Sequence, residues 1–333
     1  MTRRSLVDLP KAHLHVHLDG SLRRSTVDEI AREQGREVPR PSGYGSFDHF
    51  MDVIVAAAAC LRDEGDIRRA VREIVEDARA AGVVWLELSV WPGLFHGRLG
   101  DYRAAVSAVL DAGRTAADEL GVGFGLVAAA NRGVGVNDAI AVATVAAELA
   151  GDGVVGFGLD GDEASAPAGW FRRPFEIARA AGLLSVPHAG ENEGPGSVRS
   201  ALRDLGADRV MHGVRAIAAP DVVRELADQG TTLDICLTSN ALLGVYPVAE
   251  SPLPRLLGAG VRCSLNVDDS LLFETDLVRE YEIARTTLGL SDEQLAAVAE
   301  ASVHGSAAPA QLKTTALGSI AEWLDGGKGT KYS

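Results

Sequence analysis

The segment KAHLHVHLDG, from Lys11 to Gly20, places three of the chain's eight histidines at every second position. This alternation predicts a β-strand with His13, His15 and His17 on one face and aliphatic residues on the other. Three imidazoles on a buried face are costly unless hydrogen bonds or a metal ion compensate them. We therefore interpret the segment as a strand that carries part of a metal site.

Outward from this segment, short β-rich runs alternate with longer helical runs, a pattern typical of parallel βαβ units. Eight strands are predicted, at residues 13–19, 83–91, 123–130, 154–159, 184–188, 210–212, 232–237 and 261–268. The helical runs between the later strands are residues 66–81, 102–120, 139–149, 174–181, 197–205, 221–228 and 254–257. The pattern predicts an α/β fold, the closed (β/α)₈ TIM barrel, whose reactive groups gather at the C-terminal ends of the strands.

The connection after the first strand is long enough for extra helices, and we expect a helical lid subdomain at about residues 21–65. Its helical runs are residues 26–34 and 46–61, with a Pro/Gly-rich turn at residues 39–45 between them. An apolar stripe at helical spacing consists of Phe47, Phe50, Met51 and Ile54. This stripe is expected to cover the barrel mouth, to pack its helix on the barrel, or both.

Composition bounds the remaining possibilities. The 333 residues are 47% hydrophobic and carry a net charge of −14, which fits a globular protein with a large core and no attraction to polyanions. Nucleic acid and anionic membranes are therefore not expected as partners. We predict a single domain at residues 1–325, including the lid, and a flexible C-terminal tail at residues 326–333.

The three cysteines are far apart and form no CxxC pair, so neither a disulfide framework nor a cysteine zinc site is expected. The start of the chain has no apolar run of the kind that signal peptides need, and no segment approaches the ~18 apolar residues of a membrane helix. These features favour a cytoplasmic protein.

Further polar residues come at or just after the predicted strand ends. His188 and Glu191 lie in PHAGE after the fifth strand, His212 lies in VMHG at the sixth, and Asp268 and Asp269 lie in SLNVDD at the eighth. Two adjacent aspartates cannot both face inward along one strand, so we expect one to bind metal and its neighbour to bind substrate. Imidazole and carboxylate ligands with an open position for water are typical of a catalytic zinc site.

The motifs KAHLHVHLDGSLR, HAGENEGPGS, MHGVRAI, CLTSN and SLNVDD occur in this order over about residues 8–310. Together they resemble the adenosine deaminase family of the amidohydrolase superfamily. The resemblance implies a (β/α)₈ barrel with one zinc ion per chain. It also implies hydrolytic removal of the 6-amino group of a small-molecule purine nucleoside.

Carried over by position, the resemblance implies a zinc site formed by His15, His17, His188 and Asp268. Catalytic roles would fall to Glu191, which protonates purine N1, and to His212, which orients the attacking hydroxide. The implied substrate-binding residues are His17, Asp19, Gly161 and Asp269. Among them Asp269 would meet N7, the N–H of Gly161 would meet N3, and Asp19 would hold the ribose 5′ hydroxyl.

The chemistry is consistent with these roles. Zinc lowers the pKa of bound water from 15.7 to about 7, which supplies a nucleophile at neutral pH. A buried carboxyl group such as that of Glu191 has a raised pKa and can protonate N1 while C6 becomes tetrahedral.

The same residues can be used to test several alternative functions and substrates. Deaminases with an HxE…PCxxC zinc site are excluded because the chain has no CxxC, and the absence of a lysine near the fourth strand favours one metal over two. A non-enzymatic binding or structural protein with this fold would not need Glu191 beside a complete set of metal ligands. Departures from the family, among them His13 and Asp160, keep two other substrates open: 6-aminodeoxyfutalosine and free adenine.

Overall fold

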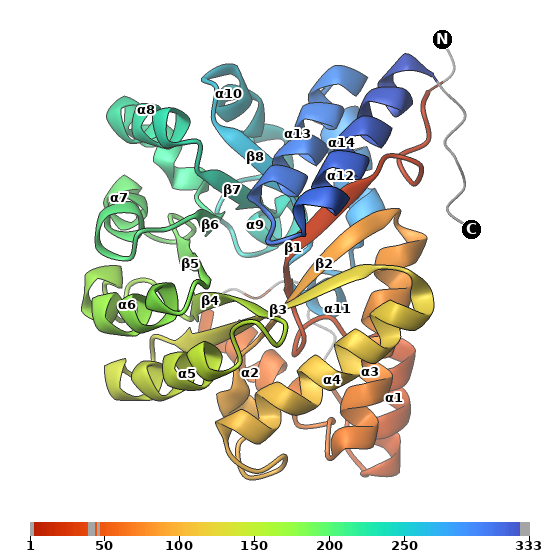
Figure 1. Cartoon of the computed structure of the whole chain (residues 1–333), viewed down its shortest axis with the longest axis vertical. Coiled ribbons are helices and arrows are strands. Elements are labelled where there is room, and N and C mark those ends of the chain that lie inside the picture. The colour runs from red at the N-terminus through yellow and green to blue at the C-terminus, as the bar shows by residue number, and fades with distance from the viewer. Residues whose placement is uncertain (1–2, 39–43, 45–46, 327–333) are drawn as a thin grey trace.

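The computed structural model describes residues 3–38, 44 and 47–326 of the chain. Eight parallel strands lie side by side in chain order, each paired with the next, and form a nearly closed barrel (Figure 1). They are β1 (Lys11–His17), β2 (Val83–Val90), β3 (Gly123–Asn131), β4 (Val154–Asp160), β5 (Leu184–Ala189), β6 (Arg209–His212), β7 (Thr232–Ile235) and β8 (Arg262–Leu265). The predicted TIM barrel is confirmed, with every strand found near its expected position.

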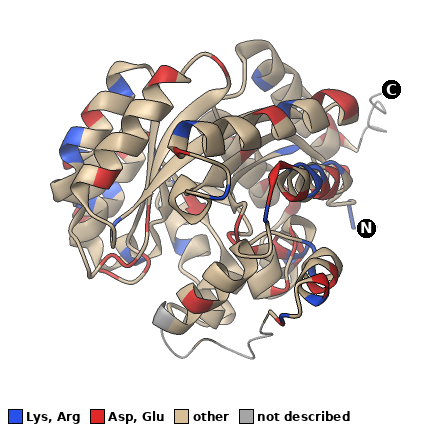
Figure 2. Cartoon of the chain, turned by 90° about the horizontal axis from the view of Figure 1, so that it is seen from below, with Lys and Arg blue, Asp and Glu red and all other residues tan. Residues whose placement is uncertain are grey.

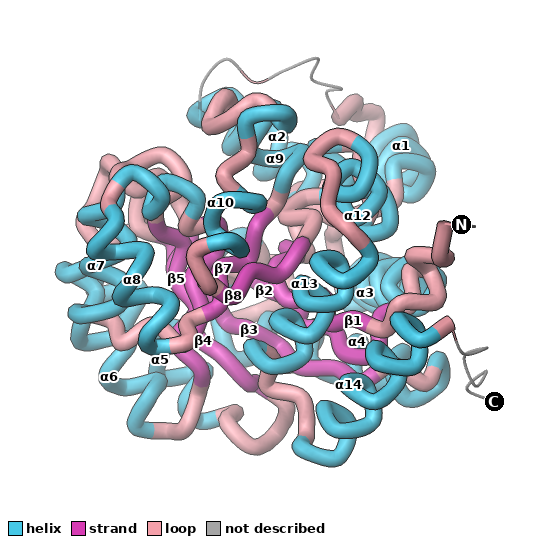
Figure 3. The backbone as a smooth tube through the Cα atoms, turned by 90° about the horizontal axis from the view of Figure 1, so that it is seen from above, coloured by secondary structure: helices cyan, strands magenta, loops and turns pink. Residues whose placement is uncertain are grey.

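Helices surround the strands on the outside of the barrel (Figure 3). They are α1 (Arg24–Glu33), α2 (Phe47–Ala58), α3 (Glu64–Ala80), α4 (Tyr102–Leu120), α5 (Val136–Glu148), α6 (Arg172–Ala180), α7 (Pro195–Asp204), α8 (Pro220–Gln229), α9 (Leu237–Leu242), α10 (Leu253–Gly258), α11 (Ser270–Phe273), α12 (Leu277–Thr286), α13 (Asp292–Gly305) and α14 (Ala310–Asp325). Acidic and basic residues are interspersed along these helices (Figure 2).

Local sequence explains where two helices of the outer layer begin. Asp63 caps α3 by accepting hydrogen bonds from the backbone N–H groups of Gly65 and Asp66. Ser291 and Gln294 form a reciprocal capping box at the start of α13, which packs against β8 and β1. Both helices bury apolar residues against the barrel, α3 beside β2 and α13 beside β8 and β1.

The first strand contains a β-bulge that the simple alternation did not predict. The pairing of β1 with β2 shifts register between His13 and Val16. The successive backbone N–H groups of Leu14 and His15 both donate to Asn266 Oδ1, at 2.8 and 3.1 Å. A bulge puts two consecutive residues opposite one partner, so side chains beyond it change face.

The bulge makes one expectation wrong: His13, His15 and His17 do not share a face. His13 and Val16 line the same cavity outside the barrel, whereas His15 and His17 meet inside it with their Nε2 atoms 3.1 Å apart. The strand therefore supplies two histidines to the interior.

The barrel closes between β8 and β1 through single contacts and not through a continuous ladder. β8 ends at Leu265, three residues before the predicted end at Asp268. Asp268 forms an isolated bridge with Val16, and its N–H and C=O bond to the backbone of His15 and His17 at 3.0 and 3.1 Å. This short bridge brings Asp268 beside the two interior histidines.

Deeper in the barrel, a buried ion cluster lies beneath these residues. The Arg209 guanidinium is 2.8 Å from a carboxylate oxygen of Glu87 and 2.8 Å from one of Asp234, and all three side chains are inaccessible to solvent. Trp85 also donates its indole N–H to Glu87 at 2.9 Å. The cluster places one guanidinium in contact with two carboxylates in the barrel below the site.

The insertion after β1 contains α1 and α2, as predicted. Phe50, Met51 and Ile54 line the cavity at the barrel mouth, and Phe50 and Ile54 are also buried in the main hydrophobic core. The stripe therefore covers the mouth and packs its helix at the same time. The Phe47 side chain, most of the predicted turn at residues 39–45 and residues 327–333 of the predicted tail lie outside the described part of the chain.

Candidate functional site

A small cavity at the C-terminal ends of the strands collects nearly all of the predicted site residues. Its polar lining consists of His17, Asp19, Trp91, Asn131, Asp160, Gly161, His188, Glu191, His212, Asp268 and Asp269. His15 lies directly beneath, fully buried and in contact with His17. The side chains come from strands or strand ends far apart in the sequence, as the barrel topology requires.

Three ligand-type atoms converge at the floor of this cavity. Nε2 of His15 is 3.1 Å from Nε2 of His17 and 3.1 Å from Oδ1 of Asp268, and Nε2 of His17 is 3.4 Å from the same oxygen. Ligands held at about 2.0–2.1 Å around a tetrahedral zinc are separated by roughly 3.3 Å. The three atoms therefore have the spacing of neighbouring ligands of one ion.

Hydrogen-bond acceptors hold the opposite nitrogens of the histidine rings. Nδ1 of His15 lies 3.4 Å from the carbonyl oxygen of Asp234, and Nδ1 of His188 lies 3.1 Å from that of Leu159. A carbonyl can only accept, so Nδ1 carries the proton and the Nε2 lone pair is free to bind a metal. The donor set thus suits a divalent cation such as zinc.

Two overlapping groups of residues have the geometry to hold a metal ion. One comprises His15, His188, His212 and Asp268, and the other comprises His17, Asp160 and His188, with ligand atoms within 4.8 Å of one another in each. His212 differs from the other histidines because the side-chain amide of Asn240 donates to its Nδ1 at 3.0 Å. Its proton then lies on Nε2, which faces Glu191 at 3.5 Å and Asp268 at 3.7 Å.

Two site residues adopt a backbone conformation that L-amino acids rarely take. Among the described residues, His212 (φ 64°) and Asp268 (φ 68°) are two of the three non-glycine residues with positive φ. Such strain persists where surrounding contacts impose it, and it concentrates at functional sites. At Asp268 it also interrupts the strand alternation, which is why Asp268 and Asp269 both reach the cavity.

The paired aspartates have different partners. Asp268 accepts a hydrogen bond from the Ser239 hydroxyl at 2.7 Å, and its histidine neighbours hold its pKa well below the usual value despite burial. Burial and the charge of Asp268 raise the pKa of Asp269 well above its usual value. Gly20 lies against Asp269, and a Cβ there would come within 1.7 Å of its Oδ1, so this position admits only glycine.

Glu191 is buried in the cavity wall with its Oε1 atom lacking any hydrogen-bond partner. Burial, reinforced by the charge of Asp268, raises its pKa to about 8. A carboxyl group in this state holds a proton at neutral pH and can donate it to a ligand.

Asp19 and Asp160 add two further carboxylates to the same wall. Asp19 is buried, its Oδ1 has no partner, and burial raises its pKa to about 6. Asp160 lies 3.1 Å from Nδ1 of His188 and 3.8 Å from Nδ1 of His17. Gly161 follows it at the cavity edge with φ 92°, and a Cβ there would lie 2.8 Å from Asn131 Oδ1.

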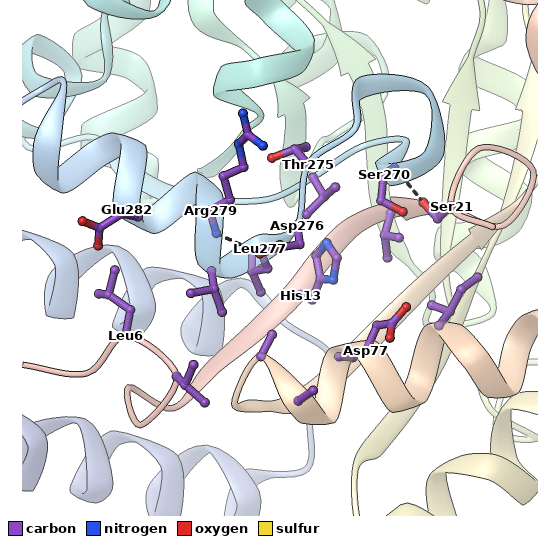
Figure 4. A pocket seen from close by; sticks show the side chains of 18 of the residues that line it. Leu6, His13, Ser21, Asp77, Ser270, Thr275, Asp276, Leu277, Arg279 and Glu282 are labelled. Carbon is purple, nitrogen blue, oxygen red and sulfur yellow. Dashed lines mark hydrogen bonds between the residues drawn. The ribbon is translucent and has the colours of Figure 1, made fainter. Parts of the chain in front are cut away.

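His13 lies away from this cavity, on the outer surface of β1. It faces a second, larger cavity between α3 and α12, together with Leu6, Asp77 and Leu277 (Figure 4). Burial lowers the pKa of His13 to about 3, so its ring is neutral. The strand separates it from the residues around His15.

Several residues that hold the site together have no role that could be predicted from the sequence. Ser239 and Asn240 belong to the quoted motif CLTSN, and Asn266 belongs to SLNVDD. The motifs marked the region, but the partners of these side chains depend on contacts between different strands. Trp91 and Asn131, which line the cavity, carried no signal in the sequence.

Fold and site together define a (β/α)₈ barrel with a buried histidine and carboxylate cluster at the mouth, the arrangement of metal-dependent hydrolases. The family model for adenosine deaminase matches residues 10–323, and the chain belongs to the adenosine deaminase family. It is a hydrolase that acts on C–N bonds.

Individual relatives agree with this assignment. The chain is 42% identical over 337 residues to a putative adenosine/adenine deaminase of Streptomyces coelicolor, covering 96% of this chain and 98% of that protein. It is similar to the crystal structure of an adenine deaminase from Arthrobacter aurescens (TM-score 0.88, 29% identity, 95% of this chain and 99% of that chain). A zinc-bound amidohydrolase from Burkholderia ambifaria aligns with a TM-score of 0.88, 25% identity and coverage of 96% and 93%.

Within the described part of the chain, no helix has the length and apolar character needed to cross a membrane.

Proposed function

We propose that the protein catalyses the zinc-dependent hydrolytic deamination of a 6-aminopurine, with adenosine and 2′-deoxyadenosine as its first candidate substrates. The observation that carries the proposal is the position of Glu191. Its carboxyl group is buried, has an oxygen without a partner and lies 3.5 Å from His212 beside the histidine and Asp268 cluster. A protonated carboxyl next to a metal-type site is what addition of water to a purine ring requires.

We propose His15, His17, His188 and Asp268 as the ligands of one zinc ion. The spacing of three of their ligand atoms, 3.1–3.4 Å, and the anchored Nδ1 atoms of His15 and His188 support this set. His212 is left out because its Nδ1 accepts from Asn240, which places a proton on the nitrogen that faces the cluster. When bound, the ion supplies Lewis-acid activation of water near neutral pH.

The chain's own residues would then handle the protons of the reaction. Glu191 donates its proton to purine N1 as water adds to C6, which avoids a negative charge on the ring. His212, held by Asn240, orients the water with its Nε2–H group. The proton of the new C6 hydroxyl passes to the amino group, and cleavage of the C6–N bond then releases ammonia and leaves the 6-oxopurine with its proton on N1.

Substrate recognition is assigned to the remaining wall residues. Asp269, which its raised pKa keeps protonated, would donate a hydrogen bond to N7. The N–H of Gly161 would meet N3. Asp19, with an unpartnered oxygen, would accept the ribose 5′ hydroxyl, which supports a nucleoside over a free base.

Free adenine is the second candidate substrate, and Asp160 is the observation that favours it. This carboxylate lines the cavity directly before Gly161, with Oδ1 3.1 Å from Nδ1 of His188 and Oδ2 3.8 Å from Nδ1 of His17. Adenine has a ring N–H next to N3, at the position that carries ribose in the nucleoside. Asp160 is placed to accept that proton, which a nucleoside lacks.

The test is ammonia release by the zinc-loaded protein from adenosine, 2′-deoxyadenosine, adenine and a 5′-substituted adenosine. A higher kcat/KM for adenosine than for adenine supports the nucleoside assignment. A higher kcat/KM for adenine than for adenosine would instead identify the free base as the preferred substrate. Preference for a 5′-substituted nucleoside by orders of magnitude would point to an aminodeoxyfutalosine-type substrate, and no turnover of any member would refute the proposal.

A further inference from the structure

The turn that carries Glu191 is held by a buried carboxylate from another loop. Glu163 follows β4 and is only 5% exposed. Its Oε1 accepts hydrogen bonds from the backbone N–H groups of Glu191 at 2.7 Å and Asn192 at 3.0 Å. Its Oε2 accepts from the N–H of Gly190 at 2.7 Å and from the Ser197 hydroxyl.

Three successive N–H groups pointing at one carboxylate form an anion-binding nest. Gly190, with φ 68°, supplies the left-handed conformation that turns its N–H toward the same point as its neighbours'. The carbonyl oxygen of Glu191 is held as well, because Arg215 Nε donates to it at 2.5 Å. The peptide groups on both sides of Glu191 are therefore fixed, while its Oε1 atom stays free for a ligand.

We propose that Glu163 is a positioning residue for Glu191. By fixing the turn at residues 190–192, it aims the Glu191 carboxyl group into the cavity at the distance that proton transfer needs. This inference rests on the proposed function, since deamination is what gives Glu191 a proton to deliver.

The hydrogen-bond pattern explains why this position requires a full-length carboxylate. Both oxygens accept two donors each, so Gln would turn its amide N–H₂ group toward at least one donor. Asp is one methylene shorter and cannot reach all three N–H groups. Either substitution leaves buried N–H groups unsatisfied and lets the turn shift.

A double-mutant cycle between Glu163 and Glu191 tests the inference. The kcat, KM, zinc content and thermal midpoint are measured for the zinc-loaded wild type, Glu163→Gln, Glu191→Gln and the double variant, with the best 6-aminopurine substrate. A displacement of about 1 Å at a reacting group costs up to ~10²-fold in rate. We expect Glu163→Gln to lower kcat ~10–10²-fold, with KM and zinc content changed less than ~3-fold.

The decisive result is the effect of Glu163→Gln in the Glu191→Gln background. A residue that acts only through Glu191 has little left to disturb there, so we expect a change in kcat of less than ~3-fold. An equal fold loss in both backgrounds overturns the inference. An inactive wild type would overturn the proposed function together with it, whereas an active wild type with equal losses overturns the positioning role alone.

Two further variants distinguish the proposed positioning role from a general folding defect. Glu163→Asp keeps the charge and replaces Glu163→Gln in the cycle if the latter does not fold, with the same expected outcome. Glu280→Gln is the matched control, since Glu280 is a buried carboxylate that accepts from the N–H groups of Leu237 and Thr238 in a different turn. Its loss in kcat should persist in the Glu191→Gln background.

Discussion

The barrel buries charge in two layers that differ in how the charge is compensated. In the deeper layer, Arg209 lies 2.8 Å from both Glu87 and Asp234, so the chain supplies its own cation. At the mouth, five carboxylates and three histidines line one cavity, and no described lysine or arginine lines it with them. Positive charge at the mouth can come from the histidines, since Asp160 raises the pKa of His188 to about 9 against the effect of burial, or from a metal ion held by the cluster.

The two layers also differ in the pKa values of their ionisable side chains. Burial first and neighbouring carboxylates second raise the pKa of Glu191 to about 8, and they also raise the pKa of Asp269 well above its usual value. In the deeper layer, the Glu87 and Asp234 carboxylates raise the pKa of the Arg209 guanidinium despite its burial. The lower layer therefore serves stability, and the upper layer keeps its protons and lone pairs available for ligands.

The largest effect is expected at Glu191 in the upper layer. Glu191→Gln keeps the shape of the side chain but cannot pass a proton, so kcat should fall by ~10²–10⁴-fold. Zinc content should match that of the wild type, because the residue is not a proposed ligand. Steady-state kinetics and metal analysis of the variant measure both quantities. Turnover near the wild-type rate would mean that another carboxylate, such as Asp160, is the proton donor.

The next effect belongs to the deeper layer and concerns stability. Arg209→Met leaves Glu87 and Asp234 buried without their cation, which should cost ~3–5 kcal/mol of unfolding free energy. Urea unfolding measures the loss. The folded fraction should still bind zinc in the same ratio as the wild type, and a loss of zinc without a loss of stability would show that the two layers are not separate.

Some residues of the two charged layers could be placed from the sequence, and others could not. The positions of His188, His212 and Asp269 in the cavity were predicted because each comes at or after a strand end in a recognisable motif. Arg209, Glu87 and Asp234 gave no signal, since three isolated charges in three strands reveal their contact only when the barrel closes.

The bulge in β1 was unpredictable for a related reason. Alternation of histidines and aliphatic residues is unbroken from His13 to His17. Asn266, the residue directly after β8, nevertheless accepts two successive N–H groups where the register shifts. The cause lies some 250 residues away in the chain, so no local pattern contains it. Sequence reasoning therefore identified His15 and His17 correctly as interior residues but placed His13 on the wrong face.

A smaller effect is expected for Asp19, which tests recognition in the upper layer. Asp19→Ala removes the acceptor proposed for the ribose 5′ hydroxyl, worth ~1–3 kcal/mol or about 5–150-fold in kcat/KM for adenosine. The kcat/KM for adenine should stay nearly constant, so the ratio of kcat/KM for adenosine to that for adenine should fall. Equal losses for both would place Asp19 against the base or the metal.

The smallest effect is expected at His13, on the outer face of β1. His13→Ala should retain zinc and keep kcat within ~2-fold, because the strand separates this ring from the cavity. His15→Ala, two residues away on the inner face, is the matched comparison and should lose the metal. Loss of zinc in both variants would contradict the register that the bulge imposes.

The proposal that most needs testing is that the histidine and carboxylate layer at the mouth holds one zinc ion on which deamination depends. The most direct measurement is the metal content of the purified wild type and of Asp268→Ala, determined by elemental analysis after zinc reconstitution and removal of loosely bound metal, alongside ammonia release from adenosine and adenine. The account predicts one zinc per wild-type chain, and loss of both zinc and activity in Asp268→Ala. Two tightly bound ions per chain, or deamination by a protein free of metal, would contradict it.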